Sequence, residues 1–392
     1  TPFYGESGGQ VGDTGVIKTA NASVTISDVK KKAGLFVHIG KVTEGEISKG
    51  DAAELGVDHD RRTAIRANHS ATHLLHEALR VALGDHVAQR GSLNAQDRLR
   101  FDFSHSKALS AAELAQVERD VNTYIRQNTP VETRIMTPDE ARDLGAQALF
   151  GEKYGDEVRV VSMGQQDRSG KGTDGNTYSL ELCGGTHVKE TAEIGAFVFT
   201  NEGSVSAGVR RVEALTGREA IHHIQAQMDL LHSISGRLGT SPDKAIQRIE
   251  ALDDELKDTR KKVDELQRKL AKYSFDEMVA NLETINGKQA LIAQLDGVPS
   301  DTLREMADWF RNKVKENGVL VLGSDIGGRP MLLVSVTDDL VKQGIKAGDL
   351  IRPVAKIIGG GGGGRPNMAQ AGGKDSSKLP EALDKARALL AE

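Results

Sequence analysis

Two pairs of residues in this sequence carry side chains that bind metal ions well. His69 and His73 lie in a stretch rich in Ala and Leu, without Gly or Pro, which predicts a helix. On a helix, residues i and i+4 face the same way, so both imidazoles can point at one ion. Cys183 and His187 have the same spacing, and Cys183 is the only cysteine. Imidazole nitrogens and a thiolate suit tetrahedral zinc, so the sequence predicts a zinc site.

Each pair also has a plainer interpretation. Two histidines on one helix face are often packed or surface residues, and an unpaired cysteine is commonly a small buried hydrophobic residue. His76 shares the face of His73 and competes with it as a ligand. The order His76-Glu77 starts like the His-Glu-x-x-His motif of zinc proteases, but Arg80 stands where the second histidine is required. Zinc is therefore favoured by the combination of the two pairs rather than by either one.

Length and composition limit the class of protein. The 392 residues leave room for two or three domains. The net charge of −5 is not typical of a nucleic-acid binder, so any contact with RNA must come from local basic patches. One cysteine favours a cytoplasmic location, and without a run of ~18 apolar residues we expect no membrane span. The chain begins at Thr1 without Met or signal peptide, which favours a fragment of a longer protein.

Hydrophobic patterning predicts an α+β protein of several domains. Residues 1–60 alternate short apolar segments with Gly, Asp and Ser turns, as in a small barrel-like β unit. Residues 61–217 mix helices and strands and form the α+β domain that contains both ligand pairs. After the first helix we expect strands at 87–93, 99–104, 131–136, 158–163, 196–200 and 208–215, and helices at 111–127 and 138–144.

Residues 218–288 are helical and highly charged. Apolar residues from Ile221 to Leu231 are followed, further on, by a seam with heptad spacing from Ile249 to Tyr273. A Gly/Ser/Pro break separates the two runs and predicts an antiparallel helical hairpin. Its simplest role is a coiled linker between two domains.

Residues 289–392 are expected to form a C-terminal α/β domain with an unusual run of glycines. Six consecutive glycines, which include Gly360, Gly362 and Gly364, are followed by three basic residues, Arg365, Lys374 and Lys378. Such a run is usually a flexible linker, but bare backbone N–H groups beside basic side chains also suit phosphates. It is not a nucleotide-binding Walker loop, because Gly-Lys-Ser/Thr is missing.

Four motifs in this order resemble alanyl-tRNA synthetases, in the part that follows the aminoacylation core. The motifs are Gly8-Gly9-Gln10, Asn68-His69-Ser70-Ala71-Thr72-His73, Cys183-Gly184-Gly185-Thr186-His187, and the glycine run with Arg365-Pro366-Asn367-Met368-Ala369-Gln370-Ala371-Gly372-Gly373. The resemblance covers the whole chain. The corresponding parts of that family are an editing domain, a coiled linker and a C-terminal domain, the last related to one found in DHH phosphoesterases.

The resemblance implies a specific activity and specific partners. It implies zinc at His69, His73, Cys183 and His187, and hydrolysis of tRNA(Ala) wrongly charged with serine or glycine. It also implies tRNA binding by the C-terminal domain, and it makes Gln89 a candidate for lining the editing pocket. The motifs for ATP and alanine activation are absent, so ATP belongs to the core outside this sequence. We therefore expect no aminoacylation by this chain alone.

Two questions about the site stay open at this point. The Thr72 hydroxyl is a candidate to bond a serine substrate, but a helix threonine ordinarily bonds to its preceding turn. Four protein ligands normally mark a closed structural zinc, whereas a catalytic zinc keeps one position open. The rival function is therefore a non-catalytic tRNA-binding module with a structural zinc. The oligomeric state is also open, with a homo-oligomer through the C-terminal region as one alternative.

Overall fold

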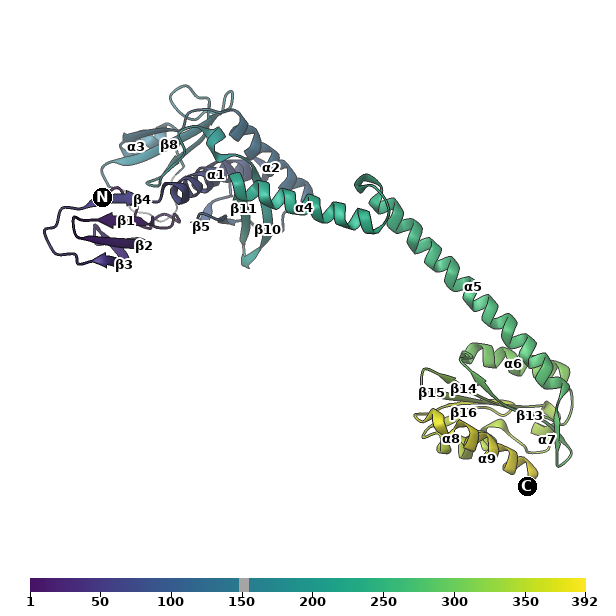
Figure 1. Cartoon of the computed structure of the whole chain (residues 1–392). Coiled ribbons are helices and arrows are strands. Elements are labelled where there is room, and N and C mark those ends of the chain that lie inside the picture. Colours follow the sequence, from purple (N-terminus) through teal and green to yellow (C-terminus); the bar gives the residue numbers. More distant parts are fainter. Residues whose placement is uncertain (148–154) are drawn as a thin grey trace. The chain divides into compact units, whose positions relative to one another are not determined.

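The computed structural model describes residues 1–147 and 155–392, which divide into two compact units, Thr1–Arg237 and Leu238–Glu392 (Figure 1). Each unit has its own hydrophobic clusters, and among the described residues no cluster draws on both units. Within the same two ranges, no helix is long and apolar enough to cross a membrane.

The first 60 residues form an open antiparallel sheet, so the expectation of a barrel-like unit is wrong. The strands are β1 (Gly15–Lys18), β2 (Ala22–Lys32), β3 (Leu35–Gly45) and β4 (Glu54–Val57), in the order β3-β2-β1-β4. The buried core of this sheet consists of Phe3, Ile26 and Val29, and β3 is exposed along almost its whole length. There is too little apolar interior for the sheet to close around.

The first predicted helix is α1 (His59–Leu83), and it carries His69 and His73 through the middle of the first unit. Asp58 caps it by accepting a hydrogen bond from the backbone N–H of Arg61, and Gly84 ends it with a φ of 112°. The helix is buried on several sides from Ile65 to Leu79, so polar residues such as Asn68 and His76 are buried together with the apolar ones.

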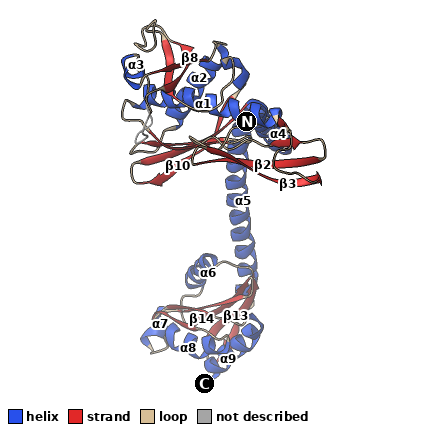
Figure 2. Cartoon of the chain, turned by 90° about the vertical axis from the view of Figure 1, so that its left-hand side faces the viewer, coloured by secondary structure: helices blue, strands red, loops and turns tan. Residues whose placement is uncertain are grey.

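A four-stranded antiparallel sheet supports α1. The strands are β5 (Gln89–Asn94), β6 (Leu99–Ser104), β10 (Phe197–Ser206) and β11 (Val209–Thr216), in the order β10-β11-β6-β5. The helix α2 (Ala111–Arg126) packs beside α1 on this sheet, and both helices share its main hydrophobic cluster (Figure 2). Each of these elements matches a predicted segment, although β10 continues to Ser206, beyond the predicted end at residue 200.

A smaller sheet delivers the Cys183–His187 segment to α1. It consists of β7 (Glu132–Met136), β8 (Val158–Gln165) and β9 (Thr177–Leu182), with α3 (Pro138–Asp143) beside it. The strand β9 ends at Leu182, and the backbone N–H of Cys183 then bonds to the carbonyl of Arg159 at 2.9 Å. A 3-10 turn, η1 (Thr191–Ile194), follows the segment and contacts both α1 and α2.

The second unit is an α/β domain built on one six-stranded sheet, in the order β12-β13-β14-β15-β17-β16. Its strands are β12 (Glu283–Ile285), β13 (Lys288–Asp296), β14 (Gly318–Ile326), β15 (Arg329–Val336), β16 (Gly361–Arg365) and β17 (Met368–Gly372). Its helices are α5 (Ala245–Ala280), α6 (Ser300–Lys313), α7 (Asp338–Lys342), α8 (Ala347–Ile357) and α9 (Leu379–Ala391). The helices α8 and α9 share one core cluster with the sheet, and α6 and the end of α5 share another.

The two helices of the predicted hairpin both form. The first is α4 (Gly217–Arg237), which belongs to the first unit, and the second is α5, which belongs to the second unit. Both carry exposed apolar residues such as Met228 and Leu266. The antiparallel pairing of the two helices stays a prediction.

Candidate metal centre

The fold brings both ligand pairs together. The ligand atoms of His69, His73, Cys183 and His187 all lie within 4.8 Å of one another. The Cys183 Sγ is 3.4 Å from the Nε2 of His69 and 3.4 Å from the Nε2 of His187. Zinc bonds of ~2.0–2.3 Å put tetrahedral ligand atoms about 3.5 Å apart, so this spacing fits one zinc ion.

Gln10 fixes the orientation of the His69 ring. Its Oε1 is 2.8 Å from the Nδ1 of His69 and can only accept, so Nδ1 carries the proton and Nε2 keeps its lone pair for a metal. The same Gln10 Oε1 accepts a hydrogen bond from the Thr186 N–H at 2.9 Å, and the Gln10 Nε2 donates one to the Thr186 hydroxyl at 2.9 Å. Gln10 is fully buried. The N-terminal glycine-rich segment therefore holds both ligand-bearing segments.

Close packing explains the second glycine of the Cys-x3-His motif. A Cβ at Gly185 would lie 2.1 Å from the His69 ring, so no larger residue fits without moving a candidate ligand. Arg159 holds the same turn from the other side, donating to the carbonyls of Cys183 at 2.9 Å and Gly185 at 2.6 Å.

Glu181 has the corresponding role for His73. Its Oε2 is 2.6 Å from the Nδ1 of His73, and its Oε1 is 2.9 Å from the Nδ1 of His76. All three side chains are buried, and the Nε2 of His73 has no hydrogen-bond partner in the described part of the chain. An unpaired buried nitrogen beside a thiol and two imidazoles has the free lone pair that a metal ligand needs. His76, the competing candidate, bonds to Glu181 instead of joining the cluster.

The electrostatics favour forms of Cys183 and His187 that can bind a metal. Burial alone would raise the pKa of the Cys183 thiol, but His69 and His73 hold that pKa well below its usual value, so the thiolate prevails. Burial, reinforced by His69, lowers the pKa of His187 to about 3, which keeps the imidazole neutral. Burial would also raise the pKa of Glu181, but His76 and His73 hold it below its usual range. Burial would lower the pKa of His73, but Glu181 and Cys183 raise it to about 10. Metal ligation needs a thiolate and neutral imidazoles, so an ion that binds here would displace a proton from His73.

Replacing Glu181 by Gln is expected to lower zinc affinity roughly 10- to 100-fold, the usual effect of losing a group that orients a metal-binding histidine. An amide has one acceptor oxygen, so one of the two imidazole N–H groups would face the amide NH₂. Chelator competition measures the affinity. Glu190→Gln, an exposed glutamate in the same segment, is the control and should leave it unchanged. Equal affinities for both variants would exclude this role of Glu181.

The metal cluster opens into a cavity of about 430 Å³. Thr72 and Gln89 line this cavity together with His69, His73 and Cys183. The Thr72 hydroxyl lies 2.9 Å from the Asn68 carbonyl and 2.7 Å from the Asn94 Oδ1, so its proton has acceptors within the protein and its oxygen is left to accept. The Gln89 Nε2 is 3.1 Å from the Ser92 Oγ. The position of both residues is compatible with a substrate contact, and their role stays a prediction.

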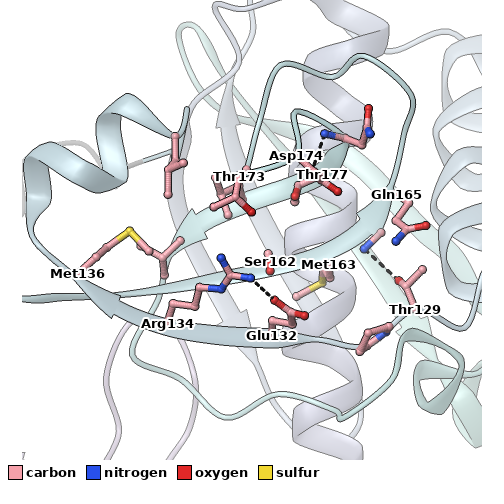
Figure 3. A pocket seen from close by; sticks show the side chains of 17 residues that line it. Thr129, Glu132, Arg134, Met136, Ser162, Met163, Gln165, Thr173, Asp174 and Thr177 are labelled. Carbon is pink, nitrogen blue, oxygen red and sulfur yellow. Dashed lines mark hydrogen bonds and ion pairs between the residues drawn. The ribbon is translucent and has the colours of Figure 1, made fainter.

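A second cavity, of about 150 Å³, lies on the sheet β7-β8-β9 under the loop that contains Thr173 and Asp174 (Figure 3). Its walls include Glu132, which is paired with Arg134 at 2.8 Å, but no histidine or cysteine. The two cavities share no lining residue. The smaller one therefore offers carboxylates but none of the nitrogen and sulfur ligands that make up the His69–His73–Cys183–His187 cluster.

The glycine run of the second unit is an edge strand, not a linker. Residues Gly361–Arg365 form β16, which pairs with β17 so that Gly361 faces Gly372 and Arg365 faces Met368. A Cβ at Gly360, Gly362 or Gly364 would lie 1.7, 2.4 or 2.4 Å from atoms of the neighbouring strand segment. These glycines are required by close packing.

The three predicted basic residues lie around this strand pair. Arg365 ends β16 at the turn, whereas Lys374 follows β17 at the opposite end, and both are exposed like Lys378. At 3.3 Å per residue the five-residue strand separates the two ends by about 13 Å. They cannot hold the same phosphate, but the spacing suits different phosphates of one RNA strand.

Several residues of the site were not identified from the sequence. Gln10 and Glu181 contact candidate ligands, and Arg159 bonds to the turn that carries Cys183, but none of the three belongs to the cluster. Of these three residues, Gln10 belongs to a motif noted in the sequence, Gly8-Gly9-Gln10. Nothing in the spacing along the chain connects Gln10 to His69, since the bond joins residues 59 positions apart.

Three models of known protein families match parts of this chain, and one of the matched parts contains two of the candidate ligands. The family model described as "Threonyl and Alanyl tRNA synthetase second additional domain" matches residues 158–213, which contain Cys183 and His187. The model "DHHA1 domain" matches residues 287–392, and "tRNA synthetases class II (A)" matches residues 1–61.

Whole-chain comparisons agree with these partial matches. Two curated proteins named "Alanine--tRNA ligase", from Ruegeria sp. (strain TM1040) and Dinoroseobacter shibae, are each 53% identical to this chain over its full length. The chain spans 44% of the length of each. Among solved structures, the C-Ala domain of Aquifex aeolicus alanyl-tRNA synthetase is 30% identical with a TM-score of 0.27, and the match covers 28% of this chain and 98% of that one. From its first residue to its last, the chain is thus similar to the C-terminal portion of alanyl-tRNA synthetases.

Proposed function

We propose that this chain is the editing and tRNA-binding portion of an alanine--tRNA ligase, and that it hydrolyses tRNA(Ala) wrongly charged with serine or glycine. The observation that carries the proposal is the His69–His73–Cys183–His187 cluster, which lies at one cavity with Thr72 and Gln89. The match to a tRNA synthetase additional domain over residues 158–213 supports it. The proposed cofactor is zinc.

The chain's own residues have three tasks in this proposal. His69, His73, Cys183 and His187 would hold the ion, with Gln10 and Glu181 keeping two of the imidazoles in the ligating tautomer. Zinc, when bound, supplies a Lewis acid that can polarise a carbonyl or lower the pKa of water. Thr72 would accept a hydrogen bond from the hydroxyl of a serine substrate, and Gln89 would line the cavity.

The number of ligands bears on how the metal acts. Four protein ligands leave no open position in a tetrahedral shell. An ion that activates water here would need a coordination position that these four residues do not fill. The alternative is that the four-ligand ion stays closed and organises the cavity walls, while a protein group positions the water.

The second unit is proposed to bind the tRNA body through Arg365, Lys374 and Lys378, with the bare strand around Gly360, Gly362 and Gly364 leaving room for the RNA backbone. Exposed lysine and arginine side chains contact phosphates. A cytoplasmic location is part of the proposal, because the proposed substrate is aminoacylated tRNA. Homo-oligomerisation through the C-terminal region is compatible with this arrangement.

The deciding experiment is a deacylation assay on Ser-tRNA(Ala), with Ala-tRNA(Ala) as the matched substrate. The proposal predicts that the zinc-loaded chain releases serine at least ~10-fold faster than it releases alanine. A site that forms a hydrogen bond with the substrate hydroxyl prefers serine over alanine, which lacks that hydroxyl, by this factor or more. Full zinc content without any serine release would instead favour the rival function, a tRNA-binding module with a structural zinc.

A further inference from the structure

We propose that the mouth of the metal cavity binds the terminal nucleotide of the tRNA, with Phe36 stacking on the adenine and Lys31 pairing with a phosphate of the 3′ end. The inference rests on the proposed deacylase function, and it assigns one part of the substrate to each of these two residues. It concerns the β2–β3 hairpin, which none of the candidate catalytic or metal-binding residues occupies (Figure 1).

Lys31 and Phe36 lie on the same face of this hairpin. The two strands are antiparallel, and Lys31 is the direct cross-strand partner of Phe36. Both residues line the 430 Å³ cavity that also contains His69, His73 and Cys183. The neighbouring pair, Lys32 and Leu35, lies on the opposite face, because adjacent residues of a strand point to opposite sides.

Phe36 presents an exposed aromatic ring at the cavity. Its side chain is 44% exposed. A Cβ at Gly5 would lie 3.1 Å from the ring, so the ring packs closely on a backbone that has no side chain there. One part of the ring is therefore held in place while the rest remains open to a partner. Stacking on a nucleobase is the common use of such a ring in proteins that bind single-stranded RNA.

Lys31 is exposed at the cavity and available to a phosphate. Lys30 is paired with Glu6 and lies 3.1 Å from Asp28. Lys31 is exposed, and among the residues that the structure describes it makes no ion pair. A cation without a partner at the rim of a cavity attracts phosphates at little desolvation cost.

One cavity contains the groups that each part of the substrate would need. The metal-binding candidates and Phe36 both line it, and so does Gly5, against which the Phe36 ring packs. In an aminoacyl-tRNA the ester is attached to the terminal ribose, and the base and phosphates continue from there. With the ester at the cluster, the base and phosphate reach the hairpin.

Three substrates of decreasing size separate the two contacts. They are Ser-tRNA(Ala), 2′(3′)-O-seryl adenosine and serine methyl ester. Phe36→Ala is expected to raise KM roughly 5- to 150-fold for the first two, which contain the adenine, and to leave the third unchanged. Lys31→Ala is expected to raise KM for Ser-tRNA(Ala) but not for the two smaller substrates. It should also reduce the slope of log KM against log salt concentration for Ser-tRNA(Ala) by about 0.7, which is the value for one phosphate contact on a single strand. Phe36→Tyr should restore most of the stacking.

The opposite face of the hairpin supplies matched controls. Leu35→Ala removes a side chain that is 69% exposed, and Lys32→Ala removes the same charge as Lys31→Ala. All variants should keep wild-type zinc content. If Phe36→Ala and Lys31→Ala behave like their controls while the wild-type chain hydrolyses Ser-tRNA(Ala), this inference is wrong and the proposed function stands. A wild-type chain that hydrolyses none of the three substrates would overturn the proposed function itself.

Discussion

Cys183→Ala is expected to remove most of the bound zinc and to lower the rate of serine release from Ser-tRNA(Ala) by at least ~100-fold. The wild-type chain should bind about one zinc ion, held by three neutral imidazoles and one thiolate. Alanine removes the only anionic ligand of the set. The Sγ also accepts from the Gly185 N–H at 3.4 Å, so the turn that carries His187 loses a contact as well. Elemental analysis after dialysis and the deacylation assay measure the two effects.

Two further variants make this result specific. Cys183→Ser keeps the size of the side chain but not the thiolate, and it should behave like the alanine variant. His86→Ala removes an exposed histidine that pairs with His105 outside the cluster, and it should leave both quantities unchanged. If Cys183→Ala retains full zinc and activity, the cysteine only fills space. If it loses zinc and retains activity, the ion has no part in hydrolysis.

The helix and the short spacings of the site were predictable because they depend on local geometry. The i, i+4 rule placed His69 and His73 on one face, and α1 indeed presents both to the same cavity. The meeting of the two pairs is non-local, and periodicity along the chain carries no information about it. The support from Gln10 and Glu181 depends on tertiary contacts over 59 and 108 positions, which no motif of the sequence encodes.

One error in the predicted fold, and one alternative that was left open for the glycine run, have physical explanations. The barrel-like N-terminal unit was inferred from alternating strands, but alternation is the same in an open sheet, and closure depends on how much apolar area must be covered. The glycine run was weighed as a flexible linker because Gly lacks side chains. Close packing against β17 instead stabilises it as a strand, at positions such as Gly362 where any Cβ would collide. In both cases tertiary packing overrides a local preference.

Truncation after Arg237 is expected to weaken tRNA binding at least ~10-fold while zinc content stays at the wild-type level, since non-specific phosphate contacts make a large part of RNA affinity. All four candidate ligands lie in the unit that ends at Arg237, and its hydrophobic clusters contain no residue of the second unit. A cut at residue 289 would be a poorer experiment. Phe275 of α5 is fully buried in a cluster of the second unit and would be exposed by it.

Single substitutions show whether the lost affinity comes from the strand pair β16–β17. Arg365→Ala and Lys374→Ala are each expected to reduce the slope of log affinity against log salt by roughly one ion, because each removes one phosphate contact. Lys342→Ala, which removes an exposed lysine of α7, is the matched control and should leave the slope unchanged. The two ends of β16 lie about 13 Å apart by strand geometry, so the two losses should add when the substitutions are combined. Slopes equal to that of Lys342→Ala would mean that the second unit is a spacer and that the tRNA contacts lie on the first unit.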